Sequence, residues 1–151
     1  MKKTTDIPKL IPIEKDTLWK EACDLTDYMY DLLSQFPEEE KWESERKLRT
    51  EANEMMLAVS IACGNSSPSG VEYDWSQARK HVAGLKTIYR FSARQKFIDL
   101  DPSIMVRLSE LMERIDERVK QSYEVTHARI KSEWHEYEEK YRLWSKMNHE
   151  N

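Results

Sequence analysis

Six basic residues and no acidic residue lie between Trp75 and Ile98, a segment that we expect to be helical. Four of them are spaced by seven, four and four residues, which places them on one helix face: Arg79, Lys86, Arg90 and Arg94. A row of guanidinium and ammonium groups can bind phosphates and release counterions. The series therefore indicates a site for RNA, DNA or another polyanion. The alternative is a solvated face that complements the acidic segment Glu14–Asp31, within the chain or in a neighbouring subunit.

A second series of residues is aromatic and lies near the C-terminus. Its members are spaced by seven, four, three, four and three residues: Tyr123, Ile130, Trp134, Tyr137, Tyr141 and Trp144. Tyr and Trp are typical anchors of protein interfaces, and an apolar stripe of this kind marks a contact surface. We predict that it packs against another subunit or a partner protein. Two alternatives stay open: the stripe folds back onto its own chain, or it stacks on bases, which the interleaved acids oppose.

Residue patterns for catalysis are weak. The chain contains no phosphate-binding glycine loop and no G-x-S-x-G motif. Cys23 and Cys63 form no C-x-x-C pair and are most simply thiols of the core. His81 is predicted to lie on a polar face, and His127 and His135 do not suggest a ligand set. We therefore expect no enzyme, no catalytic residue, no cofactor and no metal site.

The composition predicts the elements that position these residues. With only 3 glycines and 5 prolines in 151 residues, the chain has few turns and long elements. Charged residues are 34% and apolar residues 39%, as amphipathic helices require. No stretch approaches the roughly 20 apolar residues that span a bilayer, and the N-terminal residues lack the apolar run of a signal peptide. We expect an all-α, cytoplasmic protein without a membrane partner, and its net charge of −4 argues against general coating of nucleic acid.

Apolar spacing and breakers predict four helices in an up-down-up-down bundle with a long, extended C-terminal helix. Asp16 and Asp101 are candidate N-caps, Pro37 starts the second helix, and Gly64–Gly70 is the clearest loop. Tyr73 is expected to face inward, and Ile11 and Ile13 to hold an N-terminal arm. The predicted helices are Asp16–Phe36, Pro37 to about Ala62, Glu72–Ile98, and a last helix of about 45 residues after Pro102, with or without a bend near Ser122–Thr126. The predicted domains are an arm (1–13), the bundle (14–125) and a helical extension (126–151).

The segment from Leu18 to Val125 resembles a bacterial four-helix-bundle family, that of ribosomal-RNA intervening-sequence proteins and Avd-like accessory proteins of diversity-generating retroelements. The segments that carry the resemblance are Met29–Glu40, Ile61–Gly64, Leu85–Arg90, Leu108–Leu111 and Arg114–Ile115. It implies an up-down bundle that assembles as a ring, with pentamers known in the family. In Avd-like members a basic surface binds nucleic acid and a partner reverse transcriptase, and the four basic positions above match it. Those members are typically basic, whereas this chain is acidic.

These observations predict a non-catalytic, homo-oligomeric accessory protein. Its basic third helix would bind RNA, DNA or a reverse-transcriptase-like partner, and its aromatic stripe would dock a neighbour. The alternative function is that of a structural protein–protein adaptor that binds no nucleic acid.

Overall fold

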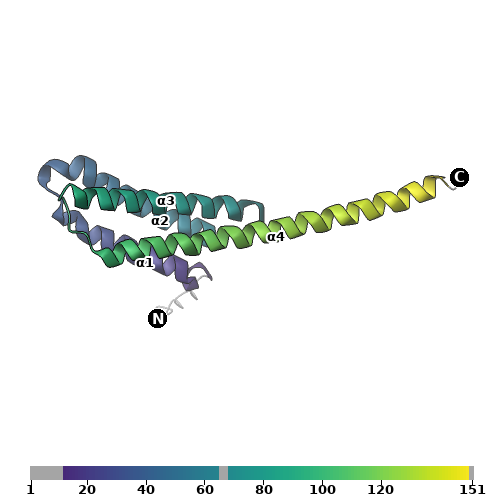
Figure 1. Ribbon diagram of the computed structural model, residues 1–151, viewed down its shortest axis with the longest axis horizontal. Helices are drawn as coiled ribbons and strands as arrows, with labels where there is room; N and C mark the ends of the chain where they lie inside the picture. Colours follow the sequence, from purple (N-terminus) through teal and green to yellow (C-terminus); the bar gives the residue numbers. More distant parts are fainter. Residues whose placement is uncertain (1–11, 65–67, 150–151) are drawn as a thin grey trace, which may run out of the picture.

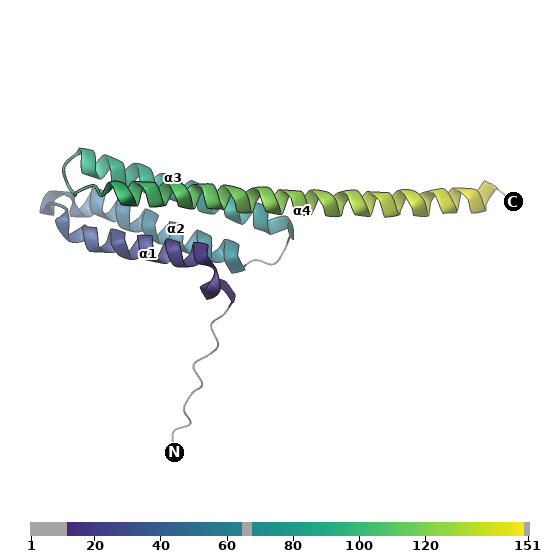
Figure 2. The ribbon, with the colours of Figure 1, turned by 60° about the horizontal axis from the view of Figure 1, so that its bottom comes forward.

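Four α-helices make up most of the chain in the computed structural model, which describes residues 12–64 and 68–149 (Figures 1 and 2). They are α1 (Thr17–Leu32), α2 (Arg46–Gly64), α3 (Pro68–Arg94) and α4 (Pro102–His149). The described ranges contain no strand, so the all-α prediction is confirmed. Most of the predicted arm, including Ile11, lies outside these ranges. Its last residues begin a short 3-10 helix, Pro12–Lys15.

The start of α1 agrees with the predicted cap, but the connection to α2 differs. Asp16 accepts a hydrogen bond from the Leu18 backbone N–H at 2.9 Å, as an N-cap does. After α1 the chain forms a 3-10 turn (Leu33–Gln35), a second one (Glu38–Glu40) and a wider π turn (Lys41–Glu45). The prediction that the second helix begins at Pro37 is therefore wrong at its start. The 3-10 turns and the π turn depart from the 3.6-residue period, so the chain becomes a regular α-helix only at Arg46.

The third helix begins and ends about four residues earlier than predicted. Lys96 adopts φ 63°, and the N–H groups of Lys96 and Phe97 donate to carbonyls of the last helical turn, which closes α3. Ile98 lies after this turn and is buried. The predicted helix includes Ile98 because its apolar side chain fits the spacing of the buried stripe, although α3 ends at Arg94. At the other end, Gly64 and Pro68–Gly70 belong to helices, which makes the connection shorter than predicted; residues 65–67 lie outside the described ranges. Tyr73 is exposed, so its predicted inward orientation is wrong.

The last helix is uninterrupted for 48 residues, which corresponds to about 72 Å, and it curves only gently, with no break near Ser122–Thr126 (Figure 1). Its start matches the prediction: Asp101 accepts hydrogen bonds from the backbone N–H and side chain of Ser103, at 2.9 and 2.7 Å. The first half of α4 packs on the other helices, and several side chains up to Ser122 are half-buried; beyond Ser122 only Thr126 and Ser145 are half-buried among the described residues. We call the packed part, Thr17–Ser122, the body, and the projecting part, Tyr123–His149, the extension.

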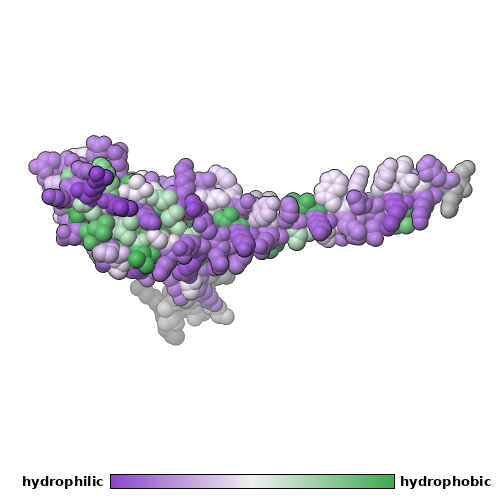
Figure 3. Space-filling model, viewed as in Figure 1, coloured by the Kyte–Doolittle hydropathy of each residue, from purple (hydrophilic) through white to green (hydrophobic). Residues whose placement is uncertain are grey.

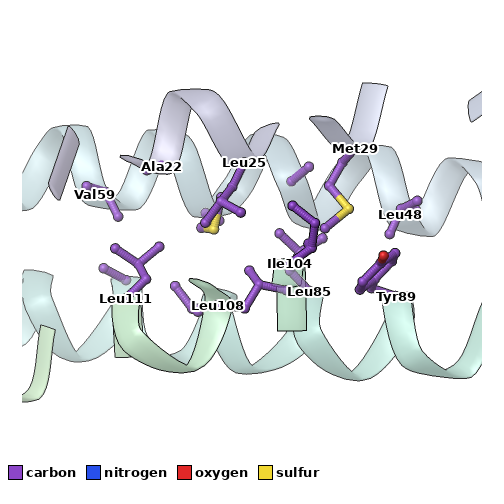
Figure 4. Packing of buried hydrophobic residues seen from close by; sticks show 14 of the residues in the cluster. Ala22, Leu25, Met29, Leu48, Val59, Leu85, Tyr89, Ile104, Leu108 and Leu111 are labelled. Atoms are coloured by element: carbon purple, nitrogen blue, oxygen red, sulfur yellow. The ribbon is translucent and has the colours of Figure 1, made fainter. Parts of the chain in front are cut away.

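The core of the body lies between the four helices. Both α2 and α4 pack against α1 and also against α3. Figure 4 shows side chains of facing helices, among them Leu25, Met29, Leu85 and Leu108, pointing into one shared interior. At one end, the Tyr89 hydroxyl accepts a hydrogen bond from the Asp101 backbone N–H at 2.8 Å, and burial raises the pKa of this tyrosine. The apolar stripes thus bury a continuous core that fixes which helix faces remain outside.

No described helix is both long enough and apolar enough to cross a membrane.

Candidate interaction surfaces

The predicted basic series lies on the outer face of α3, and three of its four members line one groove between α3 and α4. Lys86, Arg90 and Arg94 project over this groove, whose volume is about 470 Å³. Its remaining lining residues are mostly apolar and come from both helices: Ala83, Thr87, Phe91, Met105 and Met112. The groove therefore combines three cationic groups with an apolar floor. We call it the basic groove.

Arg79 belongs to the same helix face but does not line the basic groove. Its Nε donates to a carboxylate oxygen of Asp116 on α4, so an acid of the same chain already neutralises it. Lys86 is held by a hydrogen bond to a neutral group instead of an ion pair: its Nζ donates to the Ser109 hydroxyl at 2.7 Å. Among the residues that the structure describes, Arg90 and Arg94 form no ion pair. The structure thus brings three of the four predicted residues together and assigns the fourth to an ion pair.

Two acids of the first helical segment, Asp16 at its N-cap and Glu21, pair with α4, and within the described residues no ion pair joins an acid of α1 to α3. Glu21 accepts two hydrogen bonds from Arg107, at 2.7 and 3.0 Å, and these hydrogen bonds lower the pKa of Glu21. Asp16 holds Arg118 in the same bidentate manner, at 3.0 and 3.2 Å. The alternative in which acids of the first helix neutralise the basic series within the same chain is therefore wrong. Neutralisation of the basic series by acids of a neighbouring subunit stays a prediction.

The aromatic series lies entirely on the extension, where no other part of the described chain packs (Figure 3). All six predicted residues are exposed: Tyr123, Ile130, Trp134, Tyr137, Tyr141 and Trp144. The side chains of Trp134 and Trp144 expose 63% and 61% of their surface, which is high for tryptophan. Neighbouring rings contact each other along the helix, with centroids of Trp134 and Tyr137 6.1 Å apart. The stripe does not fold back onto its own body in this structure, so that alternative is wrong here.

A third surface was not predicted. Leu57 and Ile61 of α2 and Tyr73 of α3 are exposed and line a shallow depression of about 220 Å³. Leu57 and Ile61 are four residues apart and lie beside the core stripe of α2. The four-residue spacing of Leu57 and Ile61 is the sequence signal for this surface. The prediction that Tyr73 faces inward hides the third residue of the surface. Trp42, on the π turn, is 87% exposed and was likewise not singled out.

The described histidines and cysteines lie on different helices and on the extension. His81 Nδ1 lies 3.3 Å from a Glu51 carboxylate oxygen on the surface between α2 and α3. Glu124 precedes His127 with the spacing of a metal-binding pair, but both are exposed on the extension. Within residues 12–64 and 68–149, no group of three or more His, Cys, Asp or Glu side chains could hold a metal ion. Cys63 is half-buried instead of fully in the core, and burial together with the Asp16 charge raises the pKa of its thiol to about 12.

No known protein family matches this chain, and no curated protein matches it either. The resemblance to intervening-sequence and Avd-like proteins thus stays a prediction from the residues.

Proposed function

We propose that this chain is a non-catalytic, oligomeric accessory protein that binds nucleic acid through the basic groove. We infer that α1 to α4 form an up-down-up-down four-helix bundle, because consecutive helices pack against each other and α4 also packs against α1. In this proposal the bundle is a rigid support for one cationic face. A reverse-transcriptase-like partner could use the same face or the extension.

The observation that carries the proposal is the set of charges along the basic groove. Lys86, Arg90 and Arg94 line it, and among the described residues no acidic side chain does. Unpaired arginines can bind phosphates bidentately, and the exposed Phe91 offers a ring on which a base can stack. A net charge of −4 over the whole chain is compatible with binding, because no acid lies between Trp75 and Ile98 and two acids near the start of α1, Asp16 and Glu21, are paired with arginines of α4.

A second candidate function is that of a protein–protein adaptor. The exposed apolar side chains of Leu57, Ile61 and Tyr73 favour it, because contiguous apolar surface usually marks a protein contact. In that case the basic groove would receive acidic side chains of a partner instead of phosphates.

The two functions differ in how binding depends on salt. Fluorescence anisotropy with a labelled RNA–DNA duplex, at salt concentrations from about 50 to about 200 mM, measures this dependence. Three phosphate contacts predict that log K falls with log salt with a slope of about −2 to −3. The double variant R90E/R94E should abolish binding, whereas K20E, an exposed charge reversal on α1, should leave most of the affinity.

Circular dichroism would verify that both variants keep the helical content of the parent chain. If the duplex does not bind at the lowest salt concentration, or if R90E/R94E binds as well as K20E, the nucleic-acid proposal is wrong. If R90E/R94E instead lowers the mass of the oligomer, the adaptor function is favoured.

A further inference from the structure

The exposed stripe of the extension is part of a longer and regular heptad pattern. Starting from Tyr123, spacings of four and three residues continue without interruption to Asn148. The eight positions are Tyr123, His127, Ile130, Trp134, Tyr137, Tyr141, Trp144 and Asn148, which occupy d and a positions in alternation. This covers more than three heptads, the length at which a heptad pattern indicates a coiled coil. His127 was not among the predicted stripe residues, yet its ring stacks on Tyr123 at 5.0 Å and fills the gap in the series.

A helix with such a seam requires a second helix that carries the same pattern. We infer that the extension pairs with the extension of a second copy of this chain, in antiparallel orientation. The inference rests on the oligomer in the proposed function and names the contact that builds it. It does not depend on nucleic-acid binding.

The charges beside the seam select the antiparallel orientation. In an antiparallel pair, g positions face g positions and e positions face e positions. With Trp134 layered against Tyr137 of the second copy, Glu133 faces Lys140 of the second copy, and Lys131 faces Glu138. By two-fold symmetry each of these opposite-charge pairs occurs twice. In a parallel pair, by contrast, Glu133 would face Glu138 of the second copy, also twice, which is repulsive.

The same charges select one antiparallel register. A shift of seven residues in one direction places Glu133 opposite Glu133 and Lys131 opposite Lys131. A shift in the other direction places Lys140 opposite Lys140 and Glu138 opposite Glu138. Only the unshifted register pairs unlike charges at all four sites. All four side chains are exposed in the single chain and can reach a second helix.

The length of the extension fits this register independently of its charges. With Trp134 layered against Tyr137, Ser122 of one copy lies opposite His149 of the other. Ser122 is the last residue of the body as defined above, and α4 ends at His149. Each helix therefore ends where the body of the second copy begins. The seam is then used over its whole length of about 40 Å.

Charge reversal tests both the contact and its direction. Sedimentation equilibrium of the full chain without nucleic acid, at low salt, measures the dissociation constant. In the antiparallel pair, E133K creates two Lys–Lys contacts and should raise the dissociation constant about tenfold. The double variant E133K/K140E restores opposite charges and should return it to within about twofold of the parent value.

Two matched controls separate the seam from general effects on the helix. Glu133 and Glu139 each form one exposed ion pair with an arginine of the same helix, but Glu139 lies away from the seam. E139K should therefore leave the dissociation constant unchanged. W134A should weaken association by about a hundredfold or more, whereas L143A, an exposed apolar residue outside the seam, should not.

Three results would overturn the inference. One is an assembly with the same number of subunits for the full chain and for a chain that ends at Lys131. Another is tighter association of E133K, which a parallel pair predicts because the introduced lysine would then attract Glu138 of the second copy. The third is a double variant that stays as weak as E133K. These experiments contain no nucleic acid, so their results do not test whether the basic groove binds a duplex. In the same way, a failure of duplex binding does not test whether the extensions pair.

Discussion

Asp16 has two roles at the point where α1 begins and α4 leaves the body, and separate substitutions can measure each role. One carboxylate oxygen accepts the N-capping hydrogen bond from the Leu18 N–H at 2.9 Å. Both oxygens accept hydrogen bonds from Arg118, whose guanidinium also lies 5.4 Å from the centre of the Trp75 ring. The side chain of Asp16 is 18% exposed and that of Arg118 is 37% exposed, so solvent partly screens the pair.

The magnitudes follow from these contacts. An N-cap contributes about 1 kcal/mol, and a bidentate, partly screened ion pair contributes about 1 kcal/mol. Asp16→Ala removes both and should lower the free energy of unfolding by about 2 kcal/mol, or the melting temperature by about 6 °C. Asp16→Asn keeps the cap, because asparagine caps as well as aspartate, and should lose about 1 kcal/mol. Arg118→Met should lose at least as much as Asp16→Asn, since it also removes the contact with Trp75.

The pH dependence gives an independent check on the ion pair. Burial alone would raise the pKa of Asp16, but the hydrogen bond from Leu18 and the hydrogen bonds and charge of Arg118 together hold it below the ordinary 3.8. A lowered folded-state pKa means that the stabilisation is fully present above the unfolded-state pKa and is lost as the pH falls through the folded-state value. The difference in stability between the parent chain and Asp16→Asn should thus be complete at neutral pH. It should shrink from about pH 5 downward.

Urea unfolding followed by circular dichroism at 222 nm, at pH 7 and at a series of acidic pH values, measures these free energies. A double-mutant cycle of Asp16→Asn and Arg118→Met should give a coupling of about 1 kcal/mol at pH 7. The reasoning is refuted if Asp16→Asn is as stable as the parent chain at pH 7, or if its deficit is the same at every pH.

Two further predictions concern single positions of the body. Gly84→Ala should raise the free energy of unfolding by about 0.5 kcal/mol, because alanine favours a helix over glycine. The three atoms nearest to a Cβ at Gly84 would belong to the flexible carboxylate end of Glu51, the closest at 2.9 Å, and this end can move at small cost; a loss of stability in urea unfolding would show that Glu51 cannot move. Cys63 should react with a maleimide at pH 8 far more slowly in the folded chain than in urea, because its pKa is raised to about 12 and the thiolate is the reacting form. A C23S background isolates this thiol, and equal rates with and without urea would contradict the prediction.

The parts of the fold that depend on neighbouring residues were predictable. Asp16 and Asp101 cap their helices because the capping bond joins residues two positions apart. The apolar period of α4 predicted the buried positions Leu108 and Leu111 for the same reason. The ends of α2 and α3 were not predictable in this way. The π turn before α2 and the left-handed Lys96 after α3 break the period, and side chains such as Ile98 are buried on either side of the break.

The sequence by itself determined that this chain is helical, which faces of its helices are apolar, and that basic and aromatic residues form rows on α3 and on the extension. These properties follow from spacings within a few helical turns. Only the tertiary structure decided that Arg79 pairs with Asp116, and that Met105 and Met112 provide an apolar floor under the other three basic residues. It also decided that the aromatic row projects away from the body. Contacts between residues tens of positions apart depend on which helices pack together, and spacing along one helix carries no information about that choice.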